Sequence, residues 1–222
     1  MSPNGTDDAR PPLTFRQELF VQRWDDHRLY HRSRINQSLH LVSALCFIAA
    51  YALLFVSPPL AVFLGWFVAM VTRQTGHFFF EPKGYDETNQ VTHERKEAIK
   101  VGYNLRRKIV LLSVWAAIPL GLWLDPTFGG LLPAPASTYD FVWNLSVLWL
   151  GLGFAAVLVR ALFLAATRNV QTGAVWFTKI LTDPFHDVMM YWRSPLHLLR
   201  GERLDPMTDV PPAIEGSLQQ TV

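Results

Sequence analysis

Four long apolar blocks constrain the fold of this chain more than any other feature of its sequence. They cover residues 39–56, 60–80, 109–124 and 141–166. Each block is close to the roughly 20 residues that an α-helix needs to cross the hydrocarbon core of a bilayer. Hydrophobic residues make up 50% of the chain and charged residues only 17%, which also fits a membrane protein. We therefore predict an all-α polytopic membrane protein with four transmembrane helices plus amphipathic interfacial helices.

The segments around these blocks predict a single domain. Ser57-Pro58-Pro59 ends the first block, because proline lacks a backbone donor. So short a turn predicts that the second helix returns antiparallel to the first. We predict one helical membrane domain over residues 15–200, with a disordered tail at 1–14 and a polar tail at 201–222.

Two amphipathic segments flank the predicted spans. From Phe15 to Leu29, apolar residues recur at helical spacing among several arginines, which predicts a surface helix with its arginines toward lipid phosphates. Residues 174–199 mix aromatic and charged side chains. They predict an interfacial helix that is broken at Pro184 and Pro195.

The basic residues predict the orientation in the membrane. Neither residues 57–59 nor residues 125–140 contain any of the twenty lysines and arginines. The positive-inside rule then places both termini and residues 82–108 in the cytoplasm. The membrane would be the inner membrane of a bacterium or the endoplasmic reticulum of a eukaryote. No cleaved signal peptide is apparent in the polar and basic first 35 residues.

Composition disfavours two other classes of site. The net charge of +2, without a basic run interleaved with aromatics, gives no support for a nucleic-acid partner. The single cysteine, Cys46, allows neither an intrachain disulfide nor a cysteine metal motif.

A polar stripe ends the second apolar block. Arg73, His77 and Glu81 are spaced four residues apart, so a regular helix would place them on one face. Ionisable groups at membrane depth are costly and mark functional sites. Arg73 could pair with Glu81, or its planar guanidinium could bind the carboxylate of a ligand.

The predicted topology brings histidines together. All seven fall on the predicted cytoplasmic side: His27, His31, His40, His77, His93, His186 and His197. His40 opens the first block and His77 closes the second, so antiparallel helices bring them level. His31 precedes His40 by nine residues and can face the same ion only if the chain bends between them, or if His31 belongs to the surface helix.

Histidine and carboxylate ligands suggest a metal centre. Imidazole suits zinc, copper, iron and nickel, and two histidines with one carboxylate suit non-haem iron. His40, His77 and Glu81 could supply that set, with His31 and His93 as the next candidates. His93 and Glu97 repeat the four-residue spacing, which leaves a second metal open.

Two stretches carry distinctive motifs. One runs from His31 through Asn36 to His40, and the other contains Gly76-His77 followed by aromatics and Glu81. Together they resemble the membrane 2-hydroxy fatty acid dioxygenase family of yeast type. The resemblance covers about residues 24–82. It implies ferrous iron held by histidines, and an O2-dependent α-oxidation that shortens a 2-hydroxy fatty acid by one carbon. The sequence departs from the family at Arg73, where glutamine is frequent, and by inserting Lys83–Lys108.

We therefore predict an iron-dependent lipid dioxygenase at the cytoplasmic membrane face. Its partners would be a lipid or fatty acid, O2 and the membrane, with the oligomeric state left open. One alternative is a di-iron lipid hydroxylase or desaturase, although no His-x-x-His-His box is present. Another is a non-catalytic membrane scaffold or transport subunit. The predicted residues are His31, His40, His77 and His93 for Fe(II), Glu81 and Asn36 for catalysis, and Arg73 for the substrate.

Overall fold

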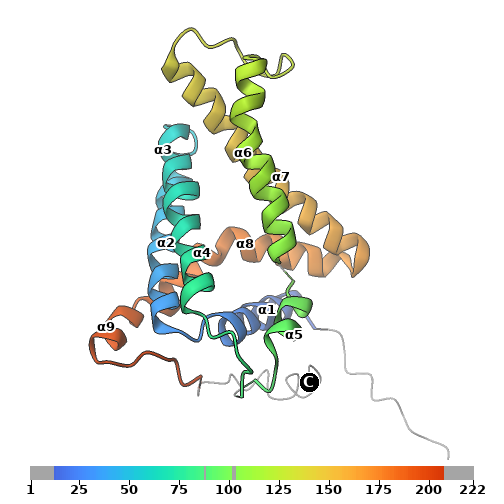
Figure 1. Cartoon of the computed structure of the whole chain (residues 1–222). Coiled ribbons are helices and arrows are strands. Elements are labelled where there is room, and N and C mark those ends of the chain that lie inside the picture. The colour runs from blue at the N-terminus through green and yellow to red at the C-terminus, as the bar shows by residue number, and fades with distance from the viewer. Residues whose placement is uncertain (1–12, 88, 102–103, 208–222) are drawn as a thin grey trace, which may run out of the picture.

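The computed structural model describes residues 13–87, 89–101 and 104–207. These residues form helices and no β-strand, which confirms the predicted all-α class. The predicted tail at residues 1–14 falls mainly outside the described residues, as does the end of the C-terminal tail after Met207. The helices form two hairpins that stand on a layer of further helices (Figure 1).

The first hairpin pairs α2 (Arg34–Leu53) with a second helical arm. That arm is divided into α3 (Pro58–Val62), the π-helical η1 (Phe63–Ala69), α4 (Met70–Thr75) and the π-helical η2 (Gly76–Phe80). Pro58 begins this arm, where its missing N–H is not needed. The predicted antiparallel return after a short turn is therefore present (Figure 1).

The second hairpin consists of α6 (Leu105–Leu124) and α7 (Thr138–Thr167). Asn104 and Ser137 cap the N-termini of these helices with side-chain oxygens. Trp115 and Trp149 stack with ring centroids 4.7 Å apart, and the Trp149 indole donates to the Trp115 carbonyl. The Trp66 indole of η1 donates to the Trp149 carbonyl at 3.3 Å. These tryptophans tie the two hairpins together.

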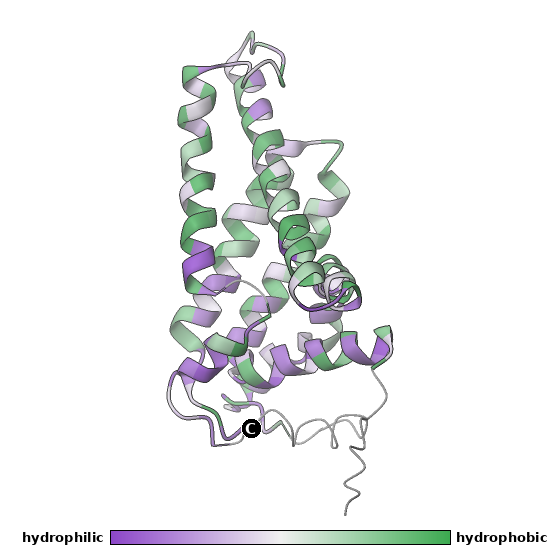
Figure 2. Cartoon of the chain, turned by 90° about the vertical axis from the view of Figure 1, so that its right-hand side faces the viewer, coloured by the Kyte–Doolittle hydropathy of each residue, from purple (hydrophilic) through white to green (hydrophobic). Residues whose placement is uncertain are grey.

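Three of the four predicted spans are helices long and apolar enough to cross a membrane. They are α2, α6 and α7. The second block, residues 60–80, is also helical, but its π-helical segments interrupt the regular helix, so its crossing stays a prediction. Hydrophobic residues dominate the upper hairpins, whereas hydrophilic residues gather at the lower end of the molecule (Figure 2).

The lower layer contains α1 (Phe15–Tyr30), α5 (His93–Ile99), α8 (Val170–Tyr191) and α9 (Ser194–Leu199). The predicted break at Pro184 is wrong, because α8 continues through it. Proline removes one backbone hydrogen bond, but the helix on both sides is held by buried Asp183 and Asp187.

The prediction that the arginines of α1 face lipid phosphates is also wrong for two of them. Arg23 lies 3.3 Å from the Asp183 carboxylate of α8. Arg28 pairs with Asp25 at 2.8 Å and donates to Asn89. Both guanidinium groups therefore bind within the protein, where α1 packs against α8 and the segment before α5.

Cysteine labelling tests the predicted orientation. In a Cys46→Ser background, Ala134→Cys is expected to react with an impermeant maleimide only from the non-cytoplasmic side, because the loop between α6 and α7 lacks basic residues. Ala134 is exposed and caps no helix. The matched variant Lys83→Cys should label only from the cytoplasm. Reaction of Ala134→Cys from the cytoplasmic side would contradict the orientation.

Candidate metal centre

Three histidine side chains converge where α1 meets the first hairpin. They are His31 at the end of α1, His40 in α2 and His77 in η2. The Nε2 atom of His40 lies 3.2 Å from that of His31 and 3.2 Å from that of His77. The three offer one ligand atom each, all within 4.8 Å of one another. The described residues thus contain a group of donors that could hold one metal ion.

A bend between α1 and α2 brings His31 to His40. His31, Arg32 and Ser33 separate the two helices, and Ser33 caps α2. The side-chain amide of Asn36 donates to the Tyr30 carbonyl, and that of Gln37 donates to the His31 carbonyl, each at 2.8 Å. These buried amides satisfy carbonyls at the end of α1, which has no further turn to accept them. They fix the bend, which was one of the two arrangements expected to let His31 face the same ion as His40.

Gly76 lets the second arm of the hairpin approach α2. A Cβ atom at this position would lie 2.0 Å from Asn36 Oδ1 and 3.4 Å from Asn36 Cα. The Asn36 side chain cannot move freely, because its amide donates to both Tyr30 and Glu81. The glycine that precedes His77 therefore sets how closely the His77 ring can lie to the His40 ring.

We expect Gly76→Ala to destabilise the protein by about 1–3 kcal/mol, because it overpacks a contact that cannot relax. The displacement of η2 should also lower iron content. The matched variant Gly151→Ala, where a Cβ would meet open space, should change neither quantity. Thermal unfolding and metal analysis of the purified variants measure both effects. A Gly76→Ala protein with unchanged stability and iron would contradict this account.

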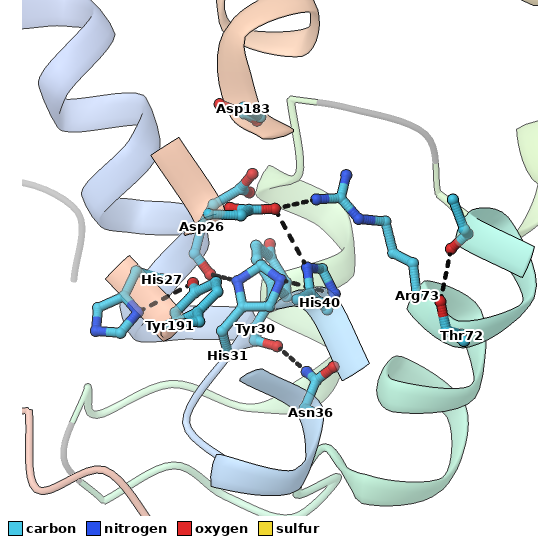
Figure 3. Close-up of polar contacts among 12 residues, drawn as sticks. Asp26, His27, Tyr30, His31, Asn36, His40, Thr72, Arg73, Asp183 and Tyr191 are labelled. Carbon is cyan, nitrogen blue, oxygen red and sulfur yellow. Dashed lines mark hydrogen bonds and ion pairs between the residues drawn. The ribbon is translucent and has the colours of Figure 1, made fainter. Parts of the chain in front are cut away.

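Hydrogen bonds fix which nitrogen of His31 carries its proton. His31 Nδ1 lies 2.8 Å from the Asp26 carbonyl oxygen, which can only accept, so Nδ1 donates. Burial lowers the pKa of His31 to about 4, so the ring is neutral at pH 7. A neutral ring with a protonated Nδ1 turns the lone pair of Nε2 toward His40 (Figure 3).

The Nε2 atom of His40 also directs a lone pair toward His31 when the proton of His40 is on Nδ1. His40 Nδ1 lies 3.7 Å from the Asp187 carboxylate and has no hydrogen-bond partner. A proton on Nδ1 faces that negative charge favourably. Two lone pairs 3.2 Å apart repel each other, and a cation between them removes the repulsion. The donor set therefore fits a metal ion.

Asp187 was missed in the sequence and links two parts of the site. It lies in α8 and forms an ion pair with Arg73 besides facing His40. A carboxylate behind a ligating histidine orients the ring and raises its basicity. The four-residue spacing of polar side chains along α8 could have indicated Asp187 in the sequence. The residues with this spacing are Lys179, Asp183, Asp187 and Tyr191, and all four are buried.

Glu81 does not join the three histidines. η2 ends at Phe80, and Glu81 is extended with φ −82° and ψ 129°, so the predicted helical stripe stops before it. Its Oε2 accepts from the Asn36 amide at 2.7 Å, and it lines a second small cavity with Asp86 and Lys96. Burial raises the pKa of Glu81 to about 7. Asn36 and Glu81 thus form a clamp between α2 and the end of η2.

The other predicted site residues do not all lie beside the three histidines. Arg73 pairs with Asp187, so the predicted alternative of an Arg73–Glu81 ion pair is wrong. His93 begins α5 and is not part of the group of three among the described residues. His186 lines the same cavity as the histidine group without belonging to it.

The three histidines open onto a polar cavity of about 90 Å³. This is small beside the roughly 300–1,000 Å³ of pockets that enclose a drug-sized ligand. Tyr191 covers one side, with its ring centroid 5.8 Å from that of His31 and 6.3 Å from that of His40. The cavity can hold a small polar group next to the histidines, but not a long acyl chain.

Comparison with known proteins finds a family match for the first part of the chain. Residues 18–84 match the Mpo1-like family model, described as 2-hydroxy-palmitic acid dioxygenase Mpo1-like. This confirms the resemblance over a stretch that contains all three histidines of the group, together with α1 and the first hairpin. No curated protein and no solved structure matches the chain.

Proposed function

We propose that this protein is an iron-dependent membrane lipid dioxygenase that carries out the O2-dependent α-oxidation of 2-hydroxy fatty acids. In this proposal His31, His40 and His77 hold Fe(II). The observation that carries it is the convergence of their three Nε2 atoms, with neighbouring separations of 3.2 Å. The description of the matching family supports the reaction class.

The separations agree with ligation of one ion. Two nitrogen ligands about 2.1 Å from one ion and about 100° apart lie about 3.2 Å from each other. Imidazole donors are suited to iron among other transition metals. The cavity beside the three histidines leaves room for a small polar group. Iron held by these histidines would supply the redox chemistry that the reaction between a hydroxy acid and O2 requires.

The reaction balances without a further reductant. A 2-hydroxy acid and O2 give the acid shorter by one carbon, CO2 and water. The bond between C1 and C2 breaks, C1 leaves as CO2, and C2 becomes the new carboxyl carbon. C2 loses three electrons and C1 loses one, and these four electrons reduce both atoms of O2. Oxygen should therefore be consumed in a one-to-one ratio with the hydroxy acid.

The surrounding residues hold and shield the reacting group. The cavity accepts the carboxyl and hydroxyl end, while the acyl chain extends along apolar helix surfaces toward the bilayer. Asp187 orients His40, and Arg73 holds Asp187 in place. We therefore assign Arg73 to bracing this carboxylate rather than to the substrate. Tyr191 limits the access of water to His31 and His40.

Metal analysis combined with O2 uptake tests the proposal. The protein purified in detergent should contain about one iron per chain, and 2-hydroxypalmitic acid should stimulate O2 uptake. Palmitic acid lacks the hydroxyl group and should not. Iron-free protein without hydroxy-acid-dependent O2 uptake would contradict the proposal and favour a scaffold or transport subunit.

A further inference from the structure

Four basic side chains line the cavity beside the histidines, and three of them are matched by aspartates of the same cavity. Arg23 pairs with Asp183, Arg73 pairs with Asp187, and Lys179 pairs with both Asp26 and Asp183. The fourth basic side chain is Lys100. Its carboxylate partner, Glu97 at 3.3 Å, does not line the cavity.

The position of Lys100 is fixed by contacts on both sides of it along the chain. The Tyr30 hydroxyl of α1 donates to the Lys96 carbonyl at 2.6 Å, and the Arg160 side chain of α7 donates to the Val101 carbonyl. Burial raises the pKa of Tyr30, so its hydroxyl remains a donor. The end of α5 is thereby held against α1 and the second hairpin, where Figure 1 shows it beside α1.

The docked segment is itself braced by a buried ion pair. Lys96 Nζ lies 2.6 Å from the Asp86 carboxylate, and both side chains are buried. Arg32 lies 3.7 Å from the same carboxylate. Lys100 is thus presented by an ordered segment. This segment lies beyond residues 18–84, the part of the chain that matches the family model.

The Lys100 side chain is mostly buried and lines the cavity. The side chain is 14% exposed, and Nζ lies 4.1 Å from the centroid of the Tyr30 ring. The ring face is favourable for a cation but leaves ammonium donors available. An anionic group that enters the cavity would meet an ammonium group whose only ion pair among the described residues is with Glu97, outside the cavity lining.

We propose that Lys100 binds the carboxylate of the substrate and makes the site selective for free acids over esters. This inference rests on the proposed function for the identity of the acid. It assigns acid recognition to the inserted segment, whereas the histidines belong to the part shared with the family. The ion pair with Glu97 would be exchanged for one with the substrate.

Titration calorimetry without O2 tests the proposal independently of turnover. Purified protein is titrated with 2-hydroxypalmitic acid and with its methyl ester. Lys100→Gln should weaken binding of the acid roughly ten- to hundredfold, because a charge-assisted hydrogen bond is lost. Binding of the ester should change less than about twofold. Lys100→Arg should retain most of the affinity for the acid.

Two further variants separate recognition from structural damage. Glu97→Gln removes the competing carboxylate and should tighten binding of the acid alone. Lys83→Gln changes an exposed lysine of the same segment and should have no effect. Unchanged acid binding in Lys100→Gln, or an equal loss for acid and ester, would overturn the role of Lys100. Failure of the proposed oxidation would appear separately, as absent iron or absent O2 uptake in the unaltered protein.

Discussion

Replacing His40 or His77 with alanine is expected to remove bound iron, with each change weakening metal affinity by more than about a hundredfold. Loss of a residue that hydrogen-bonds a metal ligand typically lowers metal affinity 10–100-fold. Loss of one of three ligands should lower the affinity further. Both rings contribute an Nε2 to the converging group. Iron content after dialysis, measured by mass spectrometry, gives the result.

The matched control is His197→Ala. His197 lies in α9 and pairs with Glu202, so its loss removes an imidazole without touching the cavity. This variant should keep full iron content and full hydroxy-acid-dependent O2 uptake. Circular dichroism must show that the His40 and His77 variants remain folded. Full iron occupancy in both folded variants would contradict the three-histidine centre and turn attention to His93 and His186.

Asp187→Ala is expected to have the second-largest effect, because it acts on stability and on metal binding together. The change leaves the partly buried guanidinium of Arg73 without its carboxylate. Removing one partner of a fully buried ion pair typically destabilises a protein by about 3–5 kcal/mol, so we expect a loss at or below the lower end of this range. It also removes the carboxylate that faces His40 Nδ1, which should weaken iron binding roughly 10–100-fold.

Asp183→Ala separates these two effects. Asp183 lies one turn earlier on α8 and pairs with Lys179 and Arg23, but it forms no ion pair with the three histidines. Its loss should destabilise the protein while leaving iron affinity within about threefold of the original. The double change Arg73→Gln with Asp187→Asn should recover part of the stability but not the iron affinity. Equal iron affinities in Asp183→Ala and Asp187→Ala would exclude a specific role for Asp187.

Local sequence was sufficient for three long apolar helices and for part of the histidine group. The apolar blocks predicted α2, α6 and α7 because the length of an apolar run reports directly on a helix that can cross a membrane. His40 and His77 could be paired because a tight turn brings opposite ends of antiparallel helices level. The second block shows the limit of this reasoning, since its π-helical segments do not follow from a run of apolar residues.

The tertiary structure decided how the site is completed. Asp187 follows Arg73 by 114 residues, and no short-range spacing in the sequence reports such a contact. Glu81 leaves the site because η2 ends one residue earlier, and a helical stripe exists only as far as the helix continues. Lys100 reaches the cavity because Tyr30 and Arg160 hold the backbone on either side of it. The sequence by itself determined which residues can bind a metal, whereas packing between distant helices determined which of them meet.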